Sequence, residues 1–178
     1  VRRALDAAGH PALLFVDGVS SIGSMDFRFD DWGVDVAVTG SQKGFMLPAG
    51  LAIVGFSDKA MKATETAKLP RTFFDVKDMQ KGYDNDAFPY TPPVGLMNGL
   101  KLSLQIIEDE GLLENTLQMG DYMLDQLNAL ADRHKVIGQA RGKGLFLGAE
   151  LVTDRDTREP ASEKHVGAVV ADCMEQGV

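Results

Sequence analysis

Asp17 and Lys43 are the residues of this chain whose types and positions best suit a chemical role. Asp17 follows the apolar run Ala12-Leu-Leu-Phe-Val16, and Lys43 follows the run 34–39 within Thr39-Gly-Ser-Gln-Lys43-Gly. Each run is short, apolar and bounded by turn residues, which is typical of a buried parallel strand. Because ligands of open α/β sheets gather outside the carboxyl ends of the strands, we expect Asp17 and Lys43 to lie beside one ligand.

A lysine and a carboxylate at such an edge suit pyridoxal phosphate. The aldehyde of this cofactor forms an imine with a lysine amine, and a carboxylate keeps its pyridine nitrogen protonated so that the ring accepts electrons. Burial and nearby cations lower the pKa of a lysine and free its amine as nucleophile and base. The same residues also suit a solvated lysine in a Gly/Ser turn and an ordinary Asp-Gly turn, so the pattern alone leaves both interpretations open.

The elements that would position these residues follow from apolar periodicity and turn residues. We expect a helix that Ser57 or Asp58 caps and that runs to about Ala67. The stretch 69–93 is rich in turn residues and aromatics, which predicts a long loop of the kind found at functional sites or interfaces. The other expected elements are a helix end at 2–8, a strand at 51–56, helices at 94–108, 111–132 and 163–176, and strands at 136–140 and 145–151.

The order of these elements predicts an α/β fold class. Strands alternate with helices early, and the pattern then becomes mixed. We expect part of a ligand-binding large domain with a mixed, mostly parallel sheet at 1–100, and linking helices with part of an α+β small domain at 101–178. Since the chain begins with Val1 rather than Met and ends at Val178 directly after a helix, we also expect a piece of a longer protein.

The composition excludes several classes of function. The formal net charge is −8 and no Lys/Arg run occurs, so the basic face that nucleic acid requires is absent. No apolar run reaches the length of a membrane span, and no signal peptide is visible. The single cysteine, Cys173, can form no internal disulfide, which favours a reducing compartment and predicts a cytoplasmic protein. The three histidines lack ligand spacing, so we expect no metal site.

The sequence around both candidate residues resembles the class V aminotransferases. The resemblance rests on Leu14-Phe-Val-Asp17-Gly-Val-Ser-Ser21-Ile-Gly, on Asp35-Val-Ala-Val-Thr-Gly-Ser-Gln-Lys43-Gly and on Pro48-Ala-Gly50-Leu. Within that class the chain is most similar to the serine–glyoxylate and alanine–glyoxylate aminotransferases. The resemblance implies a fold-type-I transferase with pyridoxal 5'-phosphate as its cofactor.

The resemblance also implies a role for each site residue. Lys43 would bind the cofactor as a Schiff base and shuttle a proton between the substrate α-carbon and the cofactor. Asp17 would pair with the pyridinium nitrogen, Val19 would pack on the ring, and Gln42 would contact the phosphate. Thr91, in Phe88-Pro-Tyr90-Thr91-Pro-Pro93, matches a loop that reaches the phosphate of the neighbouring subunit, which implies a homodimer. Without the resemblance, this segment suits an ordinary proline-rigidified connection.

After about residue 105 the chain resembles a different family, the class III aminotransferases. The similar segments begin at Ile106, include Arg141-Gly-Lys-Gly-Leu-Phe-Leu-Gly-Ala-Glu-Leu151, and end with 154–160. Class III enzymes carry their lysine in a local sequence that is absent here. We therefore hypothesise a chimeric chain whose seam lies in the helix 94–108. In class V the arginine that binds the substrate carboxylate comes later than residue 178, and we interpret Arg141 as structural.

These observations predict a transaminase that moves the amino group of L-serine or L-alanine to glyoxylate. The class III half suggests an alternative, a transaminase for pyruvate and an ω-amino acid. A third hypothesis is a chain that is catalytically inert by itself and serves at most as a dimerising or cofactor-binding module.

Overall fold

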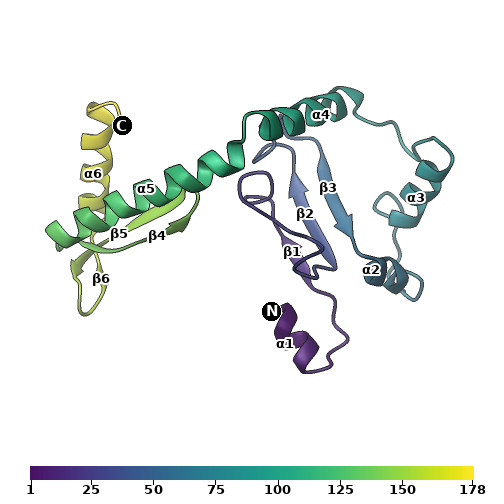
Figure 1. Ribbon diagram of the computed structural model, residues 1–178, viewed down its shortest axis with the longest axis horizontal. Coiled ribbons are helices and arrows are strands. Elements are labelled where there is room, and N and C mark those ends of the chain that lie inside the picture. The colour runs from purple at the N-terminus through teal and green to yellow at the C-terminus, as the bar shows by residue number, and fades with distance from the viewer. The chain divides into compact units, whose positions relative to one another are not determined.

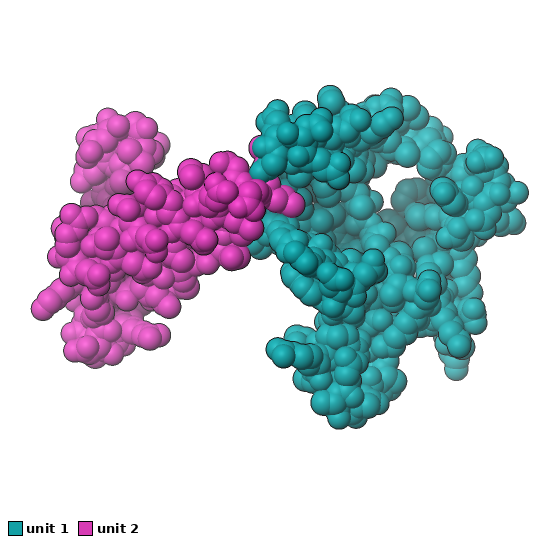
Figure 2. Space-filling model, viewed as in Figure 1, with its two compact units in different colours: residues 1–111 teal, residues 112–178 magenta.

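The computed structural model describes all residues, 1–178, and they form two compact units, 1–111 and 112–178 (Figure 2). Figure 1 shows the elements of each unit. Unit 1 contains α1 (Arg2–Ala7), β1 (Phe15–Asp17), β2 (Val36–Gly40), β3 (Ala52–Phe56), α2 (Asp58–Ala63), α3 (Val76–Asp84) and α4 (Val94–Asp109). Unit 2 contains α5 (Leu112–Arg133), β4 (Ile137–Lys143), β5 (Phe146–Asp154), β6 (Glu159–Pro160) and α6 (Glu163–Glu175).

The sheet of unit 1 has the order β1-β2-β3. Strands β1 and β2 are parallel, with Asp17 paired to Val38, and β2 and β3 are antiparallel. The sheet is therefore mixed, and the two strands that carry Asp17 and Lys43 end at the same edge, as the sequence predicts.

The prediction that the first strand is buried is wrong for this chain. Along β2, Ala37 and Thr39 are buried, so one face of the sheet belongs to the core. On the opposite face, Phe15 is 60% exposed and Val54 is 43% exposed. Part of an apolar run that suits burial therefore lies open to solvent.

A buried carboxylate ties the amino end of this sheet together. Asp35, 4% exposed, accepts hydrogen bonds from the Leu14 N–H at 2.7 Å and from the Ser57 hydroxyl at 3.2 Å. Arg2 and Lys59 also lie within 3.2 and 3.5 Å of it. Burial alone would raise the pKa of Asp35, but the Leu14 N–H, the charge of Lys59 and the Ser57 hydroxyl outweigh burial and hold this pKa below its ordinary value.

The segment expected to be a long loop contains a helix. Helix α3 begins after Asp75, whose carboxylate accepts a hydrogen bond from the Lys77 N–H at 2.9 Å as an N-cap. Its apolar residues Val76, Met79 and Tyr83 share one side of a helix of only nine residues, and none of them is buried, so the pattern is too short to separate this helix from a loop in the sequence. Helix α2 is also shorter than expected and ends at Ala63 rather than near Ala67.

The helix that contains the predicted seam and the helix that follows it are confirmed. Helix α4 spans Val94–Asp109 and α5 spans Leu112–Arg133, each within two residues of the expected bounds. The domain division expected after residue 100 would fall inside α4, whereas the two compact units divide after Gly111. That domain assignment stays a prediction.

Unit 2 is a helix packed on a β-hairpin. Strands β4 and β5 pair with Lys143 opposite Phe146, and Gly144, with φ 56, begins the turn between them. A Cβ built on Gly120 of α5 would lie 2.3 Å from the Gly144 carbonyl oxygen, so only a glycine allows this approach. No helix of the chain combines the length and apolar character that crossing a membrane requires.

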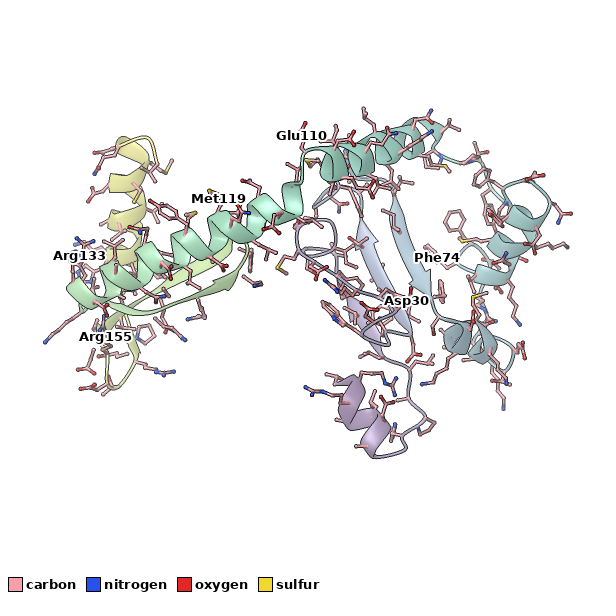
Figure 3. All side chains as sticks on the ribbon, viewed as in Figure 1. Asp30, Phe74, Glu110, Met119, Arg133 and Arg155 are labelled. Atoms are coloured by element: carbon pink, nitrogen blue, oxygen red, sulfur yellow. The ribbon has the colours of Figure 1, made fainter.

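An arginine closes the end of α5. Arg155 donates hydrogen bonds to the carbonyl oxygens of Ala131, His134 and Ile137, and Figure 3 shows it near the end of the helix where Arg133 lies. Carbonyl groups in the last turn of a helix have no partner within the helix, and a cation beside them is favourable. Arg155 therefore joins the helix end to the hairpin. The β4 arginine, Arg141, lies 3.6 Å from Glu150 on the exposed surface of the hairpin, and its expected structural role stays a prediction.

Candidate active site

Lys43 lies in a tight turn just beyond the end of β2. The turn is closed by a hydrogen bond from the Met46 N–H to the Lys43 carbonyl oxygen at 2.9 Å. Met46 has φ 57, a left-handed conformation that costs an L-residue about 1–2 kcal/mol. The Lys43 side chain is exposed and takes part in no ion pair or hydrogen bond. Its amine therefore has no partner within the chain.

Buried Ser41 fixes the base of this loop. Its side chain is 0% exposed and donates to the Pro48 carbonyl oxygen at 2.7 Å. It also accepts from the Leu51 N–H at 3.2 Å. One hydroxyl therefore joins both ends of the loop 41–51 and anchors its base. Lys43, two residues after Ser41, is exposed to solvent.

Asp17 is the last residue of β1, and it is exposed as well. Its Oδ1 accepts a hydrogen bond from the Val19 N–H at 3.0 Å, which forms a side-chain turn. The backbone leaves the strand through the Gly18 N–H, which donates to the Val38 carbonyl oxygen at 2.9 Å. The second carboxylate oxygen has no partner in the chain and is available to a ligand.

The two turns meet through their backbones. A Cβ built on Gly44 would lie 2.5 Å from the Ile22 carbonyl oxygen and 2.6 Å from the Gly23 carbonyl carbon. The ring of Phe45, which is buried, packs beside Gly23. The turn after Asp17 and the turn that carries Lys43 are therefore in direct contact, so the expectation that the two residues share one edge is confirmed.

Gln42 and Val19 lie in the same two turns, although neither contacts Lys43 or Asp17 through its side chain. The Gln42 amide folds back over Gly40, where a Cβ would come within 2.7 Å of its Oε1. Val19 is half-buried and follows Asp17 by two residues. Both are placed where they could touch a ligand at this edge, and their individual roles stay predictions.

Thr91 lies apart from these residues. It is exposed and lines a largely apolar hollow of about 660 Å³, together with residues of β3, α3, α4 and the segment 86–93. None of Asp17, Val19, Gln42 and Lys43 lines this hollow. Thr91 and these four residues therefore line different surfaces, and the predicted contact of Thr91 with a phosphate is not tested.

The residues at the shared edge suit pyridoxal phosphate. An unpaired primary amine and a carboxylate with one open oxygen stand on turns that touch, and both are reachable from solvent. The cofactor requires these two groups from a protein. In this chain Lys43 and Asp17 would hold it.

The chain is similar to known aminotransferases over different stretches. Residues 97–178 match the family model "Aminotransferase class-III". The L-aspartate–glyoxylate aminotransferase of Paracoccus denitrificans is 77% identical over 112 residues, 63% of this chain and 28% of that protein. The serine–glyoxylate aminotransferase of Methylorubrum extorquens is 49% identical over 145 residues, 79% of this chain and 32% of that protein.

A third relative and a solved structure complete the comparison. The hypotaurine/taurine–pyruvate aminotransferase of Paracoccus denitrificans is 64% identical over 76 residues, 43% of this chain and 17% of that protein. The structure of a Bacillus anthracis aminotransferase superposes with a TM-score of 0.70 at 28% identity, over 99% of this chain and 37% of that one. These likenesses show that the chain has the fold of part of a fold-type-I aminotransferase. It spans about a third or less of each relative's length.

The match to the class III family begins within α4. The match to the class III model begins at residue 97, inside the helix 94–108 where the seam is expected. The stretches similar to the aspartate–glyoxylate and taurine–pyruvate enzymes together exceed the chain, so these stretches overlap. The serine–glyoxylate enzyme of Methylorubrum extorquens aligns across α4. The chimeric origin of the chain therefore stays a hypothesis.

Three residues that shape the site are absent from the sequence prediction. Gly44 follows the lysine in the motif, and a glycine beside a reactive residue is a signal that the backbone is approached closely. Ser41 belongs to the same motif, but nothing in the sequence shows that it is buried. Ser103 of α4 donates a hydrogen bond to the Phe45 carbonyl oxygen in the loop that carries Lys43, and no local sequence pattern predicts this contact.

Proposed function

We propose that this chain forms the lysine-bearing part of a pyridoxal-phosphate aminotransferase that transfers an amino group to glyoxylate. The observation that carries the proposal is the contact of the Lys43 turn with the Asp17 turn at one edge of the sheet. The comparisons support it, since several relatives are named as glyoxylate aminotransferases.

Each of the two residues has a distinct task in this proposal. The Lys43 amine would hold the cofactor and would carry a proton between the substrate α-carbon and the cofactor. The Asp17 oxygen that Val19 leaves free would pair with the cofactor's ring nitrogen and keep it protonated. When bound, pyridoxal phosphate supplies an electron-accepting ring that stabilises negative charge at the substrate α-carbon. The Asp17–Val19 hydrogen bond orients the carboxylate for this role.

The amino donor that we propose is L-serine or L-alanine, with glycine and the donor's 2-oxo acid as products. The most identical relative reported above is named for L-aspartate, and a relative of the C-terminal part is named for hypotaurine or taurine and pyruvate. L-aspartate with glyoxylate is therefore the second donor to test. Taurine with pyruvate is the pair that tests the class III alternative.

We further propose that the working form is a homodimer. Thr91 lies in a segment whose large side chains are exposed, including Phe88 at 60% and Tyr90 at 42%, and the hollow that it lines does not include Lys43. A contact of this loop with the phosphate site of a second copy would use both features.

The experiment that tests the cofactor role is reduction with borohydride in the presence of pyridoxal phosphate, followed by peptide mass spectrometry. The expected result is an adduct concentrated on Lys43 and lost in Lys43→Ala. Lys62→Ala, which removes an exposed lysine of α2, is the matched control and should leave the adduct unchanged. An adduct spread evenly over surface lysines, or one that persists in Lys43→Ala, would contradict the proposal and favour the inert chain.

The acceptor is tested by amino transfer from each donor to glyoxylate, measured as glycine formed, and from L-serine, L-aspartate or taurine to pyruvate, measured as alanine formed. Glycine formation that Lys43→Ala abolishes is the expected result. Alanine formation from taurine and pyruvate, without any glycine from the glyoxylate reactions, would favour the class III alternative.

A further inference from the structure

The turn 43–46, here called the lysine turn, contains a strained residue, Met46. Its side chain is exposed, so side-chain packing does not hold it in place. Met46 has φ 57, and its side chain is 57% exposed. A non-glycine residue keeps such a conformation only when the surrounding structure fixes the backbone on either side. Some other contact must therefore hold the lysine turn in place.

Ser103 of α4 provides such a contact. Its side chain is 4% exposed, and its hydroxyl donates to the Phe45 carbonyl oxygen at 2.6 Å in a fully buried hydrogen bond. The two residues are 58 positions apart in the sequence, so this bond joins separate elements. The carbonyl group that it fixes belongs to the peptide unit between Phe45 and the strained Met46. In Figure 1, α4 lies near the carboxyl end of β2, from which the loop departs.

Two apolar contacts place α4 against the remainder of the loop. A Cβ on Gly99 would come within 2.9 Å of Leu47, and a Cβ on Gly50 would come within 2.6 Å of Leu96. On its other side, the lysine turn rests on Gly23 through Gly44 and the Phe45 ring. The lysine turn is thus held between α4 and the turn after Asp17, and Ser103 makes the buried hydrogen bond on the α4 side.

We infer that Ser103 is a positioning residue for Lys43. Its hydroxyl holds the Phe45 carbonyl group, which keeps Met46 in its left-handed conformation and presents Lys43 at the edge beside Asp17. Ser103 touches no reacting atom and acts through the backbone alone. The inference deepens the proposed function and rests on it only for the identity of Lys43 as the reactive residue.

The first test needs no cofactor. Hydrogen exchange at two amides measures how stably the lysine turn is held. The Met46 amide donates to the Lys43 carbonyl oxygen, and the Leu47 amide donates to the Ser41 carbonyl oxygen. In Ser103→Ala both amides should exchange about five- to tenfold faster, since one hydrogen bond is lost, while the amides of β2 should keep their rates. Gln105→Ala, an exposed change on the same helix, is the control and should alter neither.

The second test separates positioning from a general loss of structure. The fraction of the borohydride-fixed pyridoxal phosphate adduct found on Lys43, relative to other lysines, should fall several-fold in Ser103→Ala. It should recover in Ser103→Thr, which keeps the hydroxyl. If Ser103→Ala does not fold, Ser103→Cys has a similar size and a weaker donor, and it should give intermediate values in both tests.

The outcomes separate this inference from the proposed function. Unchanged exchange at Met46 and Leu47 in Ser103→Ala overturns the inference, whatever the labelling shows. No adduct on Lys43 in the unmodified chain overturns the proposed function, while faster exchange would still show that Ser103 holds the lysine turn. Equal loss of the adduct in the alanine and threonine variants would mean that the hydroxyl does not position Lys43.

Discussion

The backbone of Gly44 rests directly on that of Ile22, since a Cβ at position 44 would lie 2.5 Å from the Ile22 carbonyl oxygen. This contact joins the turn of Lys43 to the turn of Asp17. No flexible side chain takes part that could move aside. The spacing between the two candidate residues therefore depends on a position that admits only glycine.

Gly44→Ala should separate the two turns. The added methyl group meets backbone atoms, so we expect the free energy of unfolding to fall by about 1–3 kcal/mol, as for other overpacked sites. The adduct of pyridoxal phosphate on Lys43 should fall with it. Urea unfolding followed by circular dichroism measures the first effect. Gly95→Ala is the control, because a Cβ there meets nothing within 4 Å and alanine is favoured in a helix. Equal stability of both variants would show that the turns are not in contact.

The edge that carries Asp17 and Lys43 could be predicted because it depends on local features. Each residue follows an apolar run bounded by turn residues, and parallel strands end at a common edge. The helices α4 and α5 could be predicted as well, because their apolar residues recur at helical spacing over many positions.

The contacts that shape the site could not be predicted in this way. Ser103 bonds to Phe45 only because α4 packs on the loop, and a serine in a helix carries no sign of a partner 58 positions away. The exposure of Phe15 could not be predicted either. An apolar run indicates that a strand is suited to burial, but it does not show whether another segment covers the strand. Helix α3 escaped prediction because its start signal, the Asp75 cap, lies among turn residues.

Met46→Gly should stabilise the chain slightly or leave its stability unchanged. Glycine adopts φ 57 without strain, which gains about 1–2 kcal/mol, and this gain is offset by its greater freedom in the unfolded state, about 0.5–1 kcal/mol. Met119→Gly is the matched control in α5, where the same exchange should cost about 1 kcal/mol. Urea unfolding compares the two. Equal destabilisation by both changes would mean that Met46 is not strained in solution.

Asp35→Asn should change the acid sensitivity of unit 1. The pKa of Asp35 is lower in the folded chain than its ordinary value of about 3.9, so the folded state binds this proton less readily than the unfolded state. The resulting stability is fully present above the ordinary pKa and is lost as the pH falls through the lowered pKa. Wild type should therefore exceed the variant by a constant amount above about pH 5, and the difference should shrink below about pH 4.

Unfolding titrations from pH 7 to pH 3 measure this dependence. Asp31→Asn provides the control, since Asp31 is 70% exposed and lies 3.7 Å from Arg28, and such surface pairs contribute at most about 1 kcal/mol. A difference between wild type and Asp35→Asn that stays the same across the whole range would show that the ionised carboxylate is not what the fold requires.

Arg155→Ala should loosen the end of α5. The guanidinium donates to carbonyl oxygens of Ala131, His134 and Ile137, and its removal leaves them to compete for water at the junction of helix and hairpin. We expect a loss of about 1–3 kcal/mol, the cost of unmaking hydrogen bonds to a charged group. The amide of His134, bonded to the Leu130 carbonyl oxygen, should exchange faster.

Arg155→Lys should restore part of the stability, because a lysine supplies the charge without the planar group that reaches several oxygens at once. Arg141→Ala removes an exposed arginine of the same hairpin and should change stability by less than about 0.5 kcal/mol. If Arg155→Ala were no more destabilising than Arg141→Ala, the bonds of Arg155 to the end of α5 would contribute nothing to holding helix and hairpin together.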